Sequence, residues 1–411
     1  MSSEWIETDW GSIATLEYGK GLRDYRSGGG AYPVYGTNGQ VGHCESFLCP
    51  HSGIVVGRKG AYRGIHYSAN PFYVIDTAYW LKPKIDLDLK WAYYELLRQD
   101  INSLDSGSAI PSTTRDAFYS LDVFLPPIEE QKAIAHILGT LDEKIELNRK
   151  TNETLEAMAK ALFKSWFVDF DPVRAKAEGR PTGLPAEISD LFPDSFEDSE
   201  LGEIPSGWEI KAISNLCQSI SSGGTPSRKN SEYWIGGTIS WFKTGELRDS
   251  FLLESEERIT QAGLNESSCK YFDKGDILFA LYGATVGKMG IVTAPSTANQ
   301  AAACLRPLEE VGTPFLEGML YATRERLMNI ATGAAQQNLY LGVVKEHAVV
   351  APCKPLPKMF SQLVDPINQR RLCCLKESSS LSSFRNALLP KLISGEIRIP
   401  DAEKMLEEVG V

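Results

Sequence analysis

The chain has 411 residues, of which 43% are hydrophobic and 10% aromatic, so it is long enough to bury the cores of more than one domain. No apolar run approaches the roughly 18 to 20 residues that span a bilayer, and the first residues lack the features of a signal peptide, so we expect a soluble cytoplasmic protein. A formal net charge of −11 excludes a uniformly basic DNA-binding protein. Tight binding to DNA would therefore need a local basic patch or the basic surface of a partner.

Residues 1–125 are predicted to form a β-rich domain, because short apolar runs at 53–57 and 73–76 are bounded by turn residues. One cluster in this domain consists of His43, Cys44, Cys49 and His51. Its spacing matches no common structural zinc pattern, so we interpret these as loop and strand residues and predict no metal site. The eight cysteines of the chain include no C-x-x-C pair, which favours reduced thiols.

Residues 126–171 are predicted to form a long helix. Pro126 and Pro127, followed by acidic residues, are typical of a helix N-terminus. Apolar residues then recur at alternating steps of four and three, which is the pattern of a coiled-coil seam, with Asn148 and Asn152 as polar positions. The predicted seam residues of this helix are Ile134, Leu138, Leu141, Ile145, Leu155 and Leu162. About forty residues of helix would be about 60 Å long.

Residues 172–207 are predicted to be a linker that lies on the surface. The stretch is rich in proline, and it contains three basic and eight acidic residues, so it carries nearly half of the net negative charge. The rest of the chain is therefore only modestly acidic.

Residues 208–352 are predicted to be a second β-rich domain, 353–395 a second long helix, and 396–411 a C-terminal tail. The predicted seam residues of the second helix are Phe360, Leu363, Ile367, Leu381, Phe384 and Leu388. Pro366 predicts a kink or a fresh start within this helix. A helix packed on its own domain would explain one such pattern, but two matching patterns favour helices that pack on each other as an antiparallel coiled coil.

The two halves of the chain are copies of one unit. The segment that begins at Gly107 resembles the segment at Gly333, an offset of 226 residues, and about sixty residues then match without a gap. Gly60 and Gly283 begin another match upstream at an offset of 223. The predicted fold is therefore α+β, with two β-rich domains in tandem repeat, each followed by a long helix.

We find no residues that would give the chain a catalytic site. Asn70 begins a segment, Asn-Pro-Phe-Tyr, that resembles the target-base motif of adenine methyltransferases, but the second proline is missing and no glycine-rich turn for S-adenosylmethionine accompanies it. No G-x-x-x-x-G-K-[ST] loop for ATP is present, and no cluster of carboxylates indicates a nuclease metal site. We therefore predict no catalytic residue, metal or cofactor in this chain.

Several motifs, in this order and in two copies, resemble the specificity subunits of type I restriction-modification enzymes. They lie at 32–42, 57–61 and 76–79 in the first domain, 223–226 and 233–241 in the second, and 125–131, 161–170 and 388–396 in the helices. The resemblance covers nearly the whole chain. It implies two target-recognition domains that each read one part of a bipartite DNA site, and helices that pack antiparallel and act as a ruler between them.

The resemblance also implies partners and cofactors. Two methyltransferase (modification) subunits and restriction subunits would bind this chain on double-stranded DNA. The assembled complex would be an adenine-N6 DNA methyltransferase and an ATP-dependent endonuclease, with S-adenosylmethionine, ATP and Mg²⁺ held by the partner subunits. This chain would be non-catalytic. Because its two domains differ in sequence, the site would be asymmetric.

Contacts to DNA are expected in loops where basic residues alternate with aromatic, hydroxyl and amide side chains, since the former hold phosphates and the latter reach base edges. In the first domain these are Lys20, Arg23, Arg26, Arg58, Lys59, Tyr62, Arg63 and Arg115. In the second domain they are Thr225, Ser227, Arg228, Lys229, Lys243, Tyr282, Lys288, Gln336, Gln337 and Asn338. The amides at 336–338 suit adenine, which pairs well with bidentate amides.

Two other classes of protein stay open at this point. A self-sufficient DNA methyltransferase or nuclease would need the cofactor motifs that we do not find. A structural scaffold held by a coiled coil would have no nucleic-acid role, and the polar loops of the repeated β-rich domains argue against it.

Overall fold

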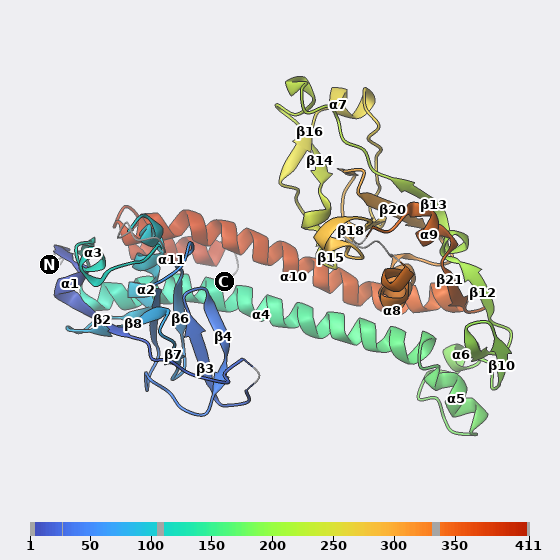
Figure 1. Ribbon diagram of the computed structural model, residues 1–411, viewed down its shortest axis with the longest axis horizontal. Coiled ribbons are helices and arrows are strands. Elements are labelled where there is room, and N and C mark those ends of the chain that lie inside the picture. Colours follow the sequence, from blue (N-terminus) through green and yellow to red (C-terminus); the bar gives the residue numbers. More distant parts are fainter. Residues whose placement is uncertain (1–4, 27, 105–110, 331–337, 409–411) are drawn as a thin grey trace. The chain divides into compact units, whose positions relative to one another are not determined.

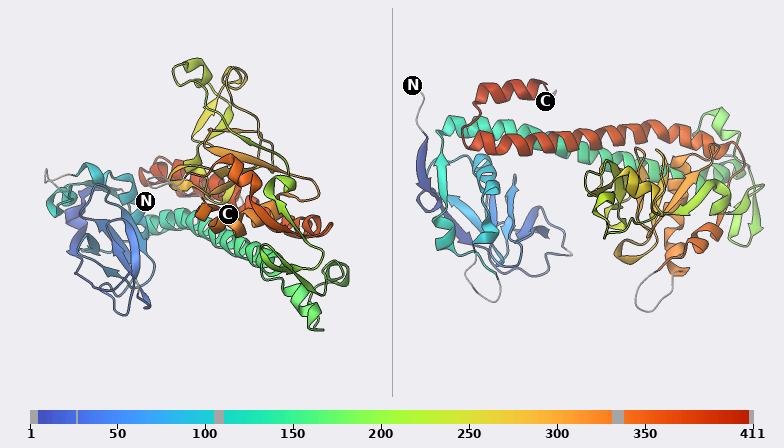
Figure 2. Two further views of the ribbon diagram at one scale, coloured as in Figure 1. Left: turned by 45° about the vertical axis from the view of Figure 1, so that its right-hand side comes forward. Right: turned by 90° about the horizontal axis from the view of Figure 1, so that it is seen from above.

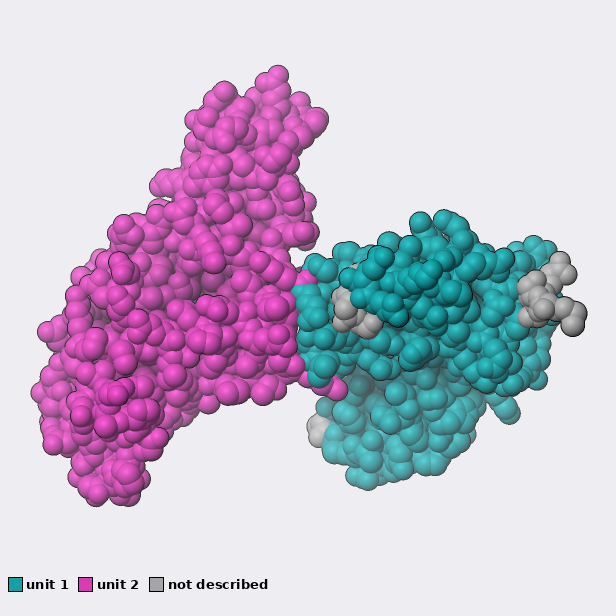
Figure 3. All heavy atoms as spheres, turned by 180° about the vertical axis from the view of Figure 1, so that it is seen from behind, with its two compact units in different colours: residues 1–148, 377–411 teal, residues 149–376 magenta. Residues whose placement is uncertain are grey.

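The computed structural model describes residues 5–26, 28–104, 111–330 and 338–408 of the chain (Figure 1). The chain divides into two compact units, which are residues 1–148 with 377–411 and residues 149–376 (Figure 3). We call them unit 1 and unit 2. The two predicted long helices are confirmed as α4 (Ile128–Phe167) and α10 (Leu356–Ile393). Both helices contribute residues to both units, so each unit combines one predicted β-rich domain with part of each helix.

The β-rich part of unit 1 contains two sheets. A four-stranded sheet has the order β2-β8-β5-β6, and a three-stranded sheet has the order β4-β3-β7, in which β3 and β7 run parallel. Strand β5 is buried along its whole length, which explains its unbroken apolar run. The strands are β2 (Ala14–Tyr18), β3 (Tyr32–Gly36), β4 (Gly39–Cys44), β5 (Gly53–Gly57), β6 (Ile65–Ser68), β7 (Tyr73–Val74) and β8 (Ala78–Pro83). A separate antiparallel pair and the short helices are β1 (Ile6–Asp9), β9 (Asp122–Leu125), α1 (Trp10–Ile13), α2 (Leu89–Arg98) and α3 (Arg115–Tyr119).

The β-rich part of unit 2 has a five-stranded sheet of order β13-β20-β17-β18-β15, a three-stranded sheet of order β16-β14-β19, and the pair β12-β21. The strands are β12 (Glu209–Ala212), β13 (Cys217–Ser222), β14 (Ile239–Phe242), β15 (Ser250–Leu252), β16 (Glu257–Ile259), β17 (Ile277–Ala280), β18 (Met289–Val292), β19 (Thr297–Ala298), β20 (Ala302–Pro307) and β21 (Ala348–Ala351). The helices of this part are α7 (Gln261–Asn265), α8 (Thr313–Ile330) and α9 (Leu341–Glu346).

The strand order confirms the internal repeat. The order β2-β8-β5-β6 in unit 1 corresponds to β13-β20-β17-β18 in unit 2, and β4-β3-β7 corresponds to β16-β14-β19, including the parallel pairing of β3 with β7 and of β14 with β19. The isolated bridges Lys59–Ser112 and Tyr282–Asn338 also match, at the offsets of 223 and 226 found in the sequence. Unit 2 adds one strand, β15, at the edge of its larger sheet.

In unit 1, α4 and α10 run antiparallel. Asp142 pairs with Arg385, and further along α4 the amide of Asn148 donates to the carboxylate of Glu377 at 2.9 Å, so polar positions of the two seams meet. The predicted seam residues of unit 1 lie within one hydrophobic core. The fully buried seam residues are Ile134, Leu138, Leu141, Leu381 and Leu388, and the partly buried ones are Ile145 and Phe384.

In unit 2 the same helices are also antiparallel, through the ion pair of Glu156 with Arg371 (3.4 Å) and the edge-to-face contact of Phe163 with Phe360 (5.5 Å between ring centres). Of the predicted seam residues, Phe360 is buried, and Leu155, Leu162 and Ile367 are half-buried. The prediction for Leu363 is wrong, because this side chain is 43% exposed and the neighbouring Val364 is buried instead.

The seam shifts by one residue because α10 packs here on the core of unit 2 as well as on α4. Val364 belongs to that core, and Arg371 is buried between the carboxylates of Glu156 and Glu317. Burial raises the pKa of Glu317 to about 6. Of the two alternatives predicted at Pro366, the fresh start is wrong, since α10 runs through it without a break.

The predicted surface linker at 172–207 is wrong as a description of this stretch. It folds into α5 (Asp171–Ala177), α6 (Ala186–Ser189) and the hairpin β10 (Phe196–Ser199) and β11 (Gly202–Pro205). Val173 and Phe192 are buried in the core of unit 2, where Phe192 packs edge-to-face on Trp166 at 5.3 Å. The many prolines and acidic residues led to the linker prediction, because only a few apolar side chains pack this stretch into the core.

The predicted C-terminal tail at 396–411 contains the helix α11 (Ile399–Glu408), which lies beside the helix pair of unit 1 (Figure 2). Ala402 and Leu406 are buried in the same core as Ile134 of α4. Trp5 also joins this region, because its indole N–H donates to Glu130 at 3.0 Å. Segments from both halves of the repeat therefore complete unit 1.

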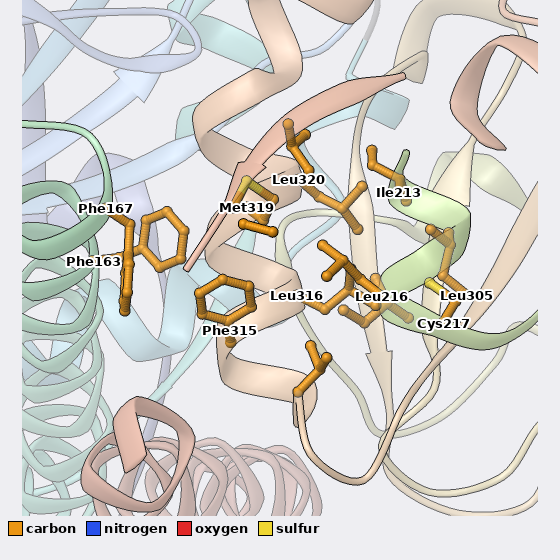
Figure 4. Close-up of a cluster of buried hydrophobic side chains, with 14 of the residues drawn as sticks. Phe163, Phe167, Ile213, Leu216, Cys217, Leu305, Phe315, Leu316, Met319 and Leu320 are labelled. Atoms are coloured by element: carbon orange, nitrogen blue, oxygen red, sulfur yellow. The ribbon is translucent and has the colours of Figure 1, made fainter. Parts of the chain in front are cut away.

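The core of unit 2 brings α4, α8 and the strands together (Figure 4). Phe163 and Phe167 of α4 face Phe315 of α8, while the other side chains labelled in the figure extend the cluster toward the sheet. Gly318 of α8 permits this approach, since a Cβ at that position would lie 2.2 Å from Cδ2 of Phe163. A larger side chain at 318 would separate α8 from α4.

We expect Gly318→Ala to destabilise unit 2, even though alanine favours a helix over glycine by about 1 kcal/mol. The added methyl overlaps a ring held on several sides, and overpacking of this kind costs roughly 1–3 kcal/mol. Gly342→Ala in α9 is the matched control, because its Cβ would meet nothing within 4 Å. Urea and thermal unfolding followed by tryptophan fluorescence measure both variants. Equal stability of the two variants would contradict this packing.

Candidate nucleic-acid interface

Four segments of unit 1 meet at one end of the four-stranded sheet: residues 18–20 after β2, 57–60 after β5, 74–78 before β8, and 111–115. Backbone hydrogen bonds hold them in place. The N–H of Lys20 donates to Val74 (2.9 Å), that of Arg58 to Thr77 (3.0 Å) and that of Thr113 to Arg58 (2.9 Å). The side chains carried by these segments therefore have fixed starting points.

Tyr18, at the end of β2, has two guanidinium groups over its ring. The Cζ atoms of Arg58 and Arg115 lie 4.8 and 4.4 Å from the ring centre, a distance typical of cation–π contacts. Arg58 also donates from Nη1 to the carbonyl of Asp76 at 3.1 Å, and Tyr18 packs on Tyr79. A hydrogen bond from Arg115 lowers the pKa of the Tyr18 hydroxyl. We call Tyr18, Arg58 and Arg115 the arginine–tyrosine cluster.

Most of the basic residues predicted to contact DNA in unit 1 have no carboxylate partner. Among the described residues, no ion pair involves Lys20, Arg23, Arg26, Arg58, Lys59 or Arg115. Lys20, Lys59 and Tyr62 are exposed, the last with 64% of its surface. Cations in this state can meet an anion without first breaking an ion pair.

Arg63 does not belong to this surface, so the prediction that it contacts DNA is wrong. The residue is 2% exposed. Its guanidinium donates to the hydroxyl of Thr113 (3.0 Å) and to the carbonyls of Gly60 (2.9 Å) and Asn102 (2.8 Å). A buried charge needs such partners, and here they hold together the loop that carries Lys59.

Unit 2 has the same backbone frame as unit 1. Its matching bonds run from the N–H of Gly224 to Ala298 (2.9 Å), of Leu281 to Ala301 (2.8 Å) and of Leu339 to Leu281 (2.8 Å). The side chains at the equivalent positions are different. The counterparts in register are Ser222 for Tyr18, Leu281 for Arg58, Ala303 for Tyr79 and Leu341 for Arg115.

Three predicted basic residues of unit 2 are already paired with carboxylates. Arg228 pairs with Glu257 and lies 3.7 Å over the ring of Trp234, and this ion pair lowers the pKa of Glu257. Lys243 contacts Glu256 (2.6 Å) and Glu257 (3.2 Å). Lys288 pairs with Asp249 at 2.8 Å, and Arg324 pairs with the same carboxylate at 2.5 Å. These cations are less available to phosphate than those of unit 1.

The remaining predicted residues of unit 2 do not form one cluster in the described part of the chain. Thr225 donates to the amide oxygen of Gln300, and Ser227 and Lys229 are exposed. Tyr282 and Asn338 meet through a backbone bridge, and Asn338 is exposed. Gln336 and Gln337 lie outside the described residues.

Sequence reasoning missed Tyr18 and Tyr79. In the sequence, Tyr18 follows Glu17 and Tyr79 follows Ala78, which is an ordinary pattern for strand residues. Only the pairing of β2 with β8 places both rings beside the arginines. A tyrosine directly before the Gly19–Lys20 loop was the signal available.

The residues considered for metal or methyl-transfer chemistry are dispersed. Cys44 donates to the carbonyl of Ser46, and the Cys49 sulfur lies 3.5 Å from Nδ1 of His51. Within the described ranges, no three histidine, cysteine or acidic side chains are grouped to hold a metal ion. Asn70 is exposed in the loop between β6 and β7.

None of the helices described is both long enough and apolar enough to cross a membrane. The longest, α4 and α10, carry many charged residues along their length.

Comparison with known proteins identifies the family. The family model described as type I restriction modification DNA specificity domain matches residues 3–157 and 205–356, which are the two copies of the repeat. The HindI specificity subunit of Haemophilus influenzae, a type I restriction enzyme, is 32% identical over 332 residues, covering 70% of this chain and 71% of that protein. The MjaIX specificity subunit of Methanocaldococcus jannaschii is 24% identical over 372 residues, covering 89% and 82%.

A solved structure has the same fold. The S subunit of a type I restriction-modification system from M. genitalium matches with a TM-score of 0.66 at 18% identity, covering 95% of this chain and 96% of that one. With the two-copy family match, this establishes that the chain belongs to the family of type I restriction-modification specificity subunits.

Proposed function

We propose that this chain is the DNA-recognition subunit of a type I restriction-modification complex. It reads an asymmetric, bipartite site in double-stranded DNA, one block with the β-rich domain of each unit. It also binds two modification subunits and the restriction subunits. The assembled complex is an adenine-N6 DNA methyltransferase and an ATP-dependent endonuclease that acts in the cytoplasm.

The observation that carries this proposal is the repeated backbone frame with different side chains in each copy. The same strand order and the same backbone hydrogen bonds recur in both units, whereas the side chains at the end of the larger sheet change from charged and aromatic to small and apolar. Two readers of this kind suit two different short sequences. A palindromic site would instead call for two similar readers.

Charge supports a role for partners in DNA binding. The whole chain has a net charge of −11, and in unit 2 Arg228, Lys243 and Lys288 are paired with carboxylates. Because phosphate neutralisation supplies much of DNA affinity, the modification subunits have to contribute basic surface.

The helices offer surface for those partners. Leu147 of α4 in unit 1 is 58% exposed, and in unit 2 Met158 of α4 and Leu363 of α10 are 53% and 43% exposed. Obligate complexes bury apolar side chains of this kind at their subunit interfaces. We place the modification subunits there.

Catalysis resides in the partners under this proposal. S-adenosylmethionine, ATP and Mg²⁺ bind to the modification and restriction subunits, and this chain positions them on DNA. The competing proposal of a self-sufficient methyltransferase or nuclease rests on Asn70 alone, and no residue that would bind S-adenosylmethionine lies beside it in the sequence.

Mapping methylated adenines in cells that carry the complex tests the proposal directly. We expect two short blocks of different sequence separated by several unread base pairs, because readers on one face of DNA reach successive major grooves about 10 base pairs apart. Exchanging residues 1–125 for another recognition domain should change one block only. A continuous palindromic motif, or an exchange that alters both blocks, would refute the two-reader model.

Shortening the helices tests their role as a ruler. Segments 145–151 and 374–380 contain Asn148 and Glu377, which are bonded to each other, so deleting both segments removes this pair together. Seven residues amount to about 10 Å of helix, or roughly three base pairs, and preserve the helix face. We expect a shorter spacer or loss of methylation. A variant that methylates the original site at the original rate would rule out the ruler.

The lone chain should transfer no methyl group. When the purified chain is incubated with labelled S-adenosylmethionine and genomic DNA, we expect methyl incorporation at background level. Addition of the modification subunits should raise incorporation above background. Asn70→Ala should change neither result, because this exposed residue has no catalytic role. Incorporation by the lone chain that Asn70→Ala abolishes would support the competing enzyme instead.

A further inference from the structure

The arginine–tyrosine cluster concentrates positive charge on an ordered support. Arg58 and Arg115 both lie over the ring of Tyr18, a residue that is 44% exposed, and neither forms an ion pair with a described carboxylate. Stacking on the ring and the bond from Arg58 to the carbonyl of Asp76 limit the rotation of these long side chains. Such preorganised guanidinium groups lose less conformational entropy on binding than free ones.

The internal repeat separates what the fold needs from what it does not. The backbone bonds of Arg58 to Thr77 and Thr113 recur at Leu281 in unit 2, so the frame stands without the arginine. Leu281, the counterpart of Arg58, is buried in the core of unit 2, whereas in unit 1 Arg58 is half-buried and Tyr18 is exposed. The cluster is therefore not required to build this end of the sheet.

The same comparison bears on what the cluster contacts. The sugar–phosphate backbone is the same whatever the sequence, so residues that only hold phosphates can recur in both domains. Residues that read bases have to differ between domains that read different blocks. The cluster is charged and aromatic in the first domain and has no charged counterpart in the second, which is the difference expected of a base reader.

We propose that the arginine–tyrosine cluster is a base-reading site of the first domain and that its ligand is guanine in the major groove. A planar guanidinium donates two parallel N–H bonds to O6 and N7 of guanine, a pattern that no other base offers. Arg58 and Arg115 supply these donors, and Tyr18 is a positioning residue that holds them. This inference rests on the proposed function and adds to it the residues and the base.

Methylation mapping with the intact complex tests the assignment. The decisive variant is Arg58→Lys with Arg115→Lys, which keeps both charges but removes the forked donors. We expect it to relax a guanine in one block to other bases, with a loss of methylation at the original site on the order of tenfold to a hundredfold. The other block should stay unchanged. Arg398→Lys, at an exposed arginine outside both domains, is the matched control and should leave both blocks intact.

Modified DNA gives an independent readout. A duplex that carries the mapped site with 7-deazaguanine at that position lacks the N7 acceptor. The wild-type complex should bind it about tenfold or more weakly than the normal duplex, whereas the double-lysine variant should show a smaller difference between the two duplexes because an ammonium group lacks the fork. Tyr18→Ala should also lose discrimination, since it removes both the ring under the two arginines and the hydroxyl that accepts a hydrogen bond from Arg115. Circular dichroism verifies that each variant is folded.

Two outcomes would overturn the assignment. One is an unchanged motif in the double-lysine variant. The other is an equal fall in affinity for all sequences in Arg58→Gln with Arg115→Gln, accompanied by a shallower salt dependence, which would make the cluster a phosphate contact. Either result leaves a bipartite motif for the wild-type complex, so it is distinguishable from failure of the proposed function, in which no such motif is found.

Discussion

Neither long helix can bury its apolar seam alone, and each is covered by a segment from the other end of the chain. In unit 1 the first part of α4 packs on the last part of α10, and in unit 2 the last part of α4 packs on the first part of α10. This single requirement explains why unit 1 is discontinuous in sequence, with residues 377–411 packed on residues 1–148. It also explains the polar positions, because Asn148 is buried only where Glu377 is available to accept its hydrogen bond. A shift of either helix along the other would leave that amide without its partner.

The sequence predicted those features that rest on periodicity and repetition. The seam predicted in unit 1 matches the structure, because Ile134, Leu138 and Leu141 are buried in one core with Leu381 and Leu388 of α10. In unit 2 the choice between the adjacent Leu363 and Val364 depended on a second surface, the core around Phe163, and a heptad pattern holds no information about that surface. The prediction of a surface linker at 172–207 was wrong for a similar reason. It rested on the proline-rich, acidic composition, whereas only a few apolar side chains anchor this stretch in the core.

For the candidate interface, the sequence indicated which residue types could contact DNA, but it could not predict which of them are buried. Arg58 and Arg63 belong to one loop with equal charge, yet one lies over Tyr18 and the other is enclosed by carbonyl groups. What separates them is the set of neighbours brought by β2 and by Asn102 and Thr113, which are distant in sequence. The basic residues of unit 2 show the same limit, because Glu256 and Glu257 neutralise Arg228 and Lys243 only after the chain has folded.

The shared backbone frame has a consequence for how such a protein can change. At the end of the larger sheet, peptide N–H and carbonyl groups supply the bonds that fix the loops, and these bonds are the same whether the side chain is arginine or leucine. Substitutions there therefore act on the surface presented to a ligand while the bonds that fix the loop remain. Mutational tolerance and new binding preference then arise at the same positions, so a lineage can explore many ligand specificities by single substitutions without passing through unfolded intermediates.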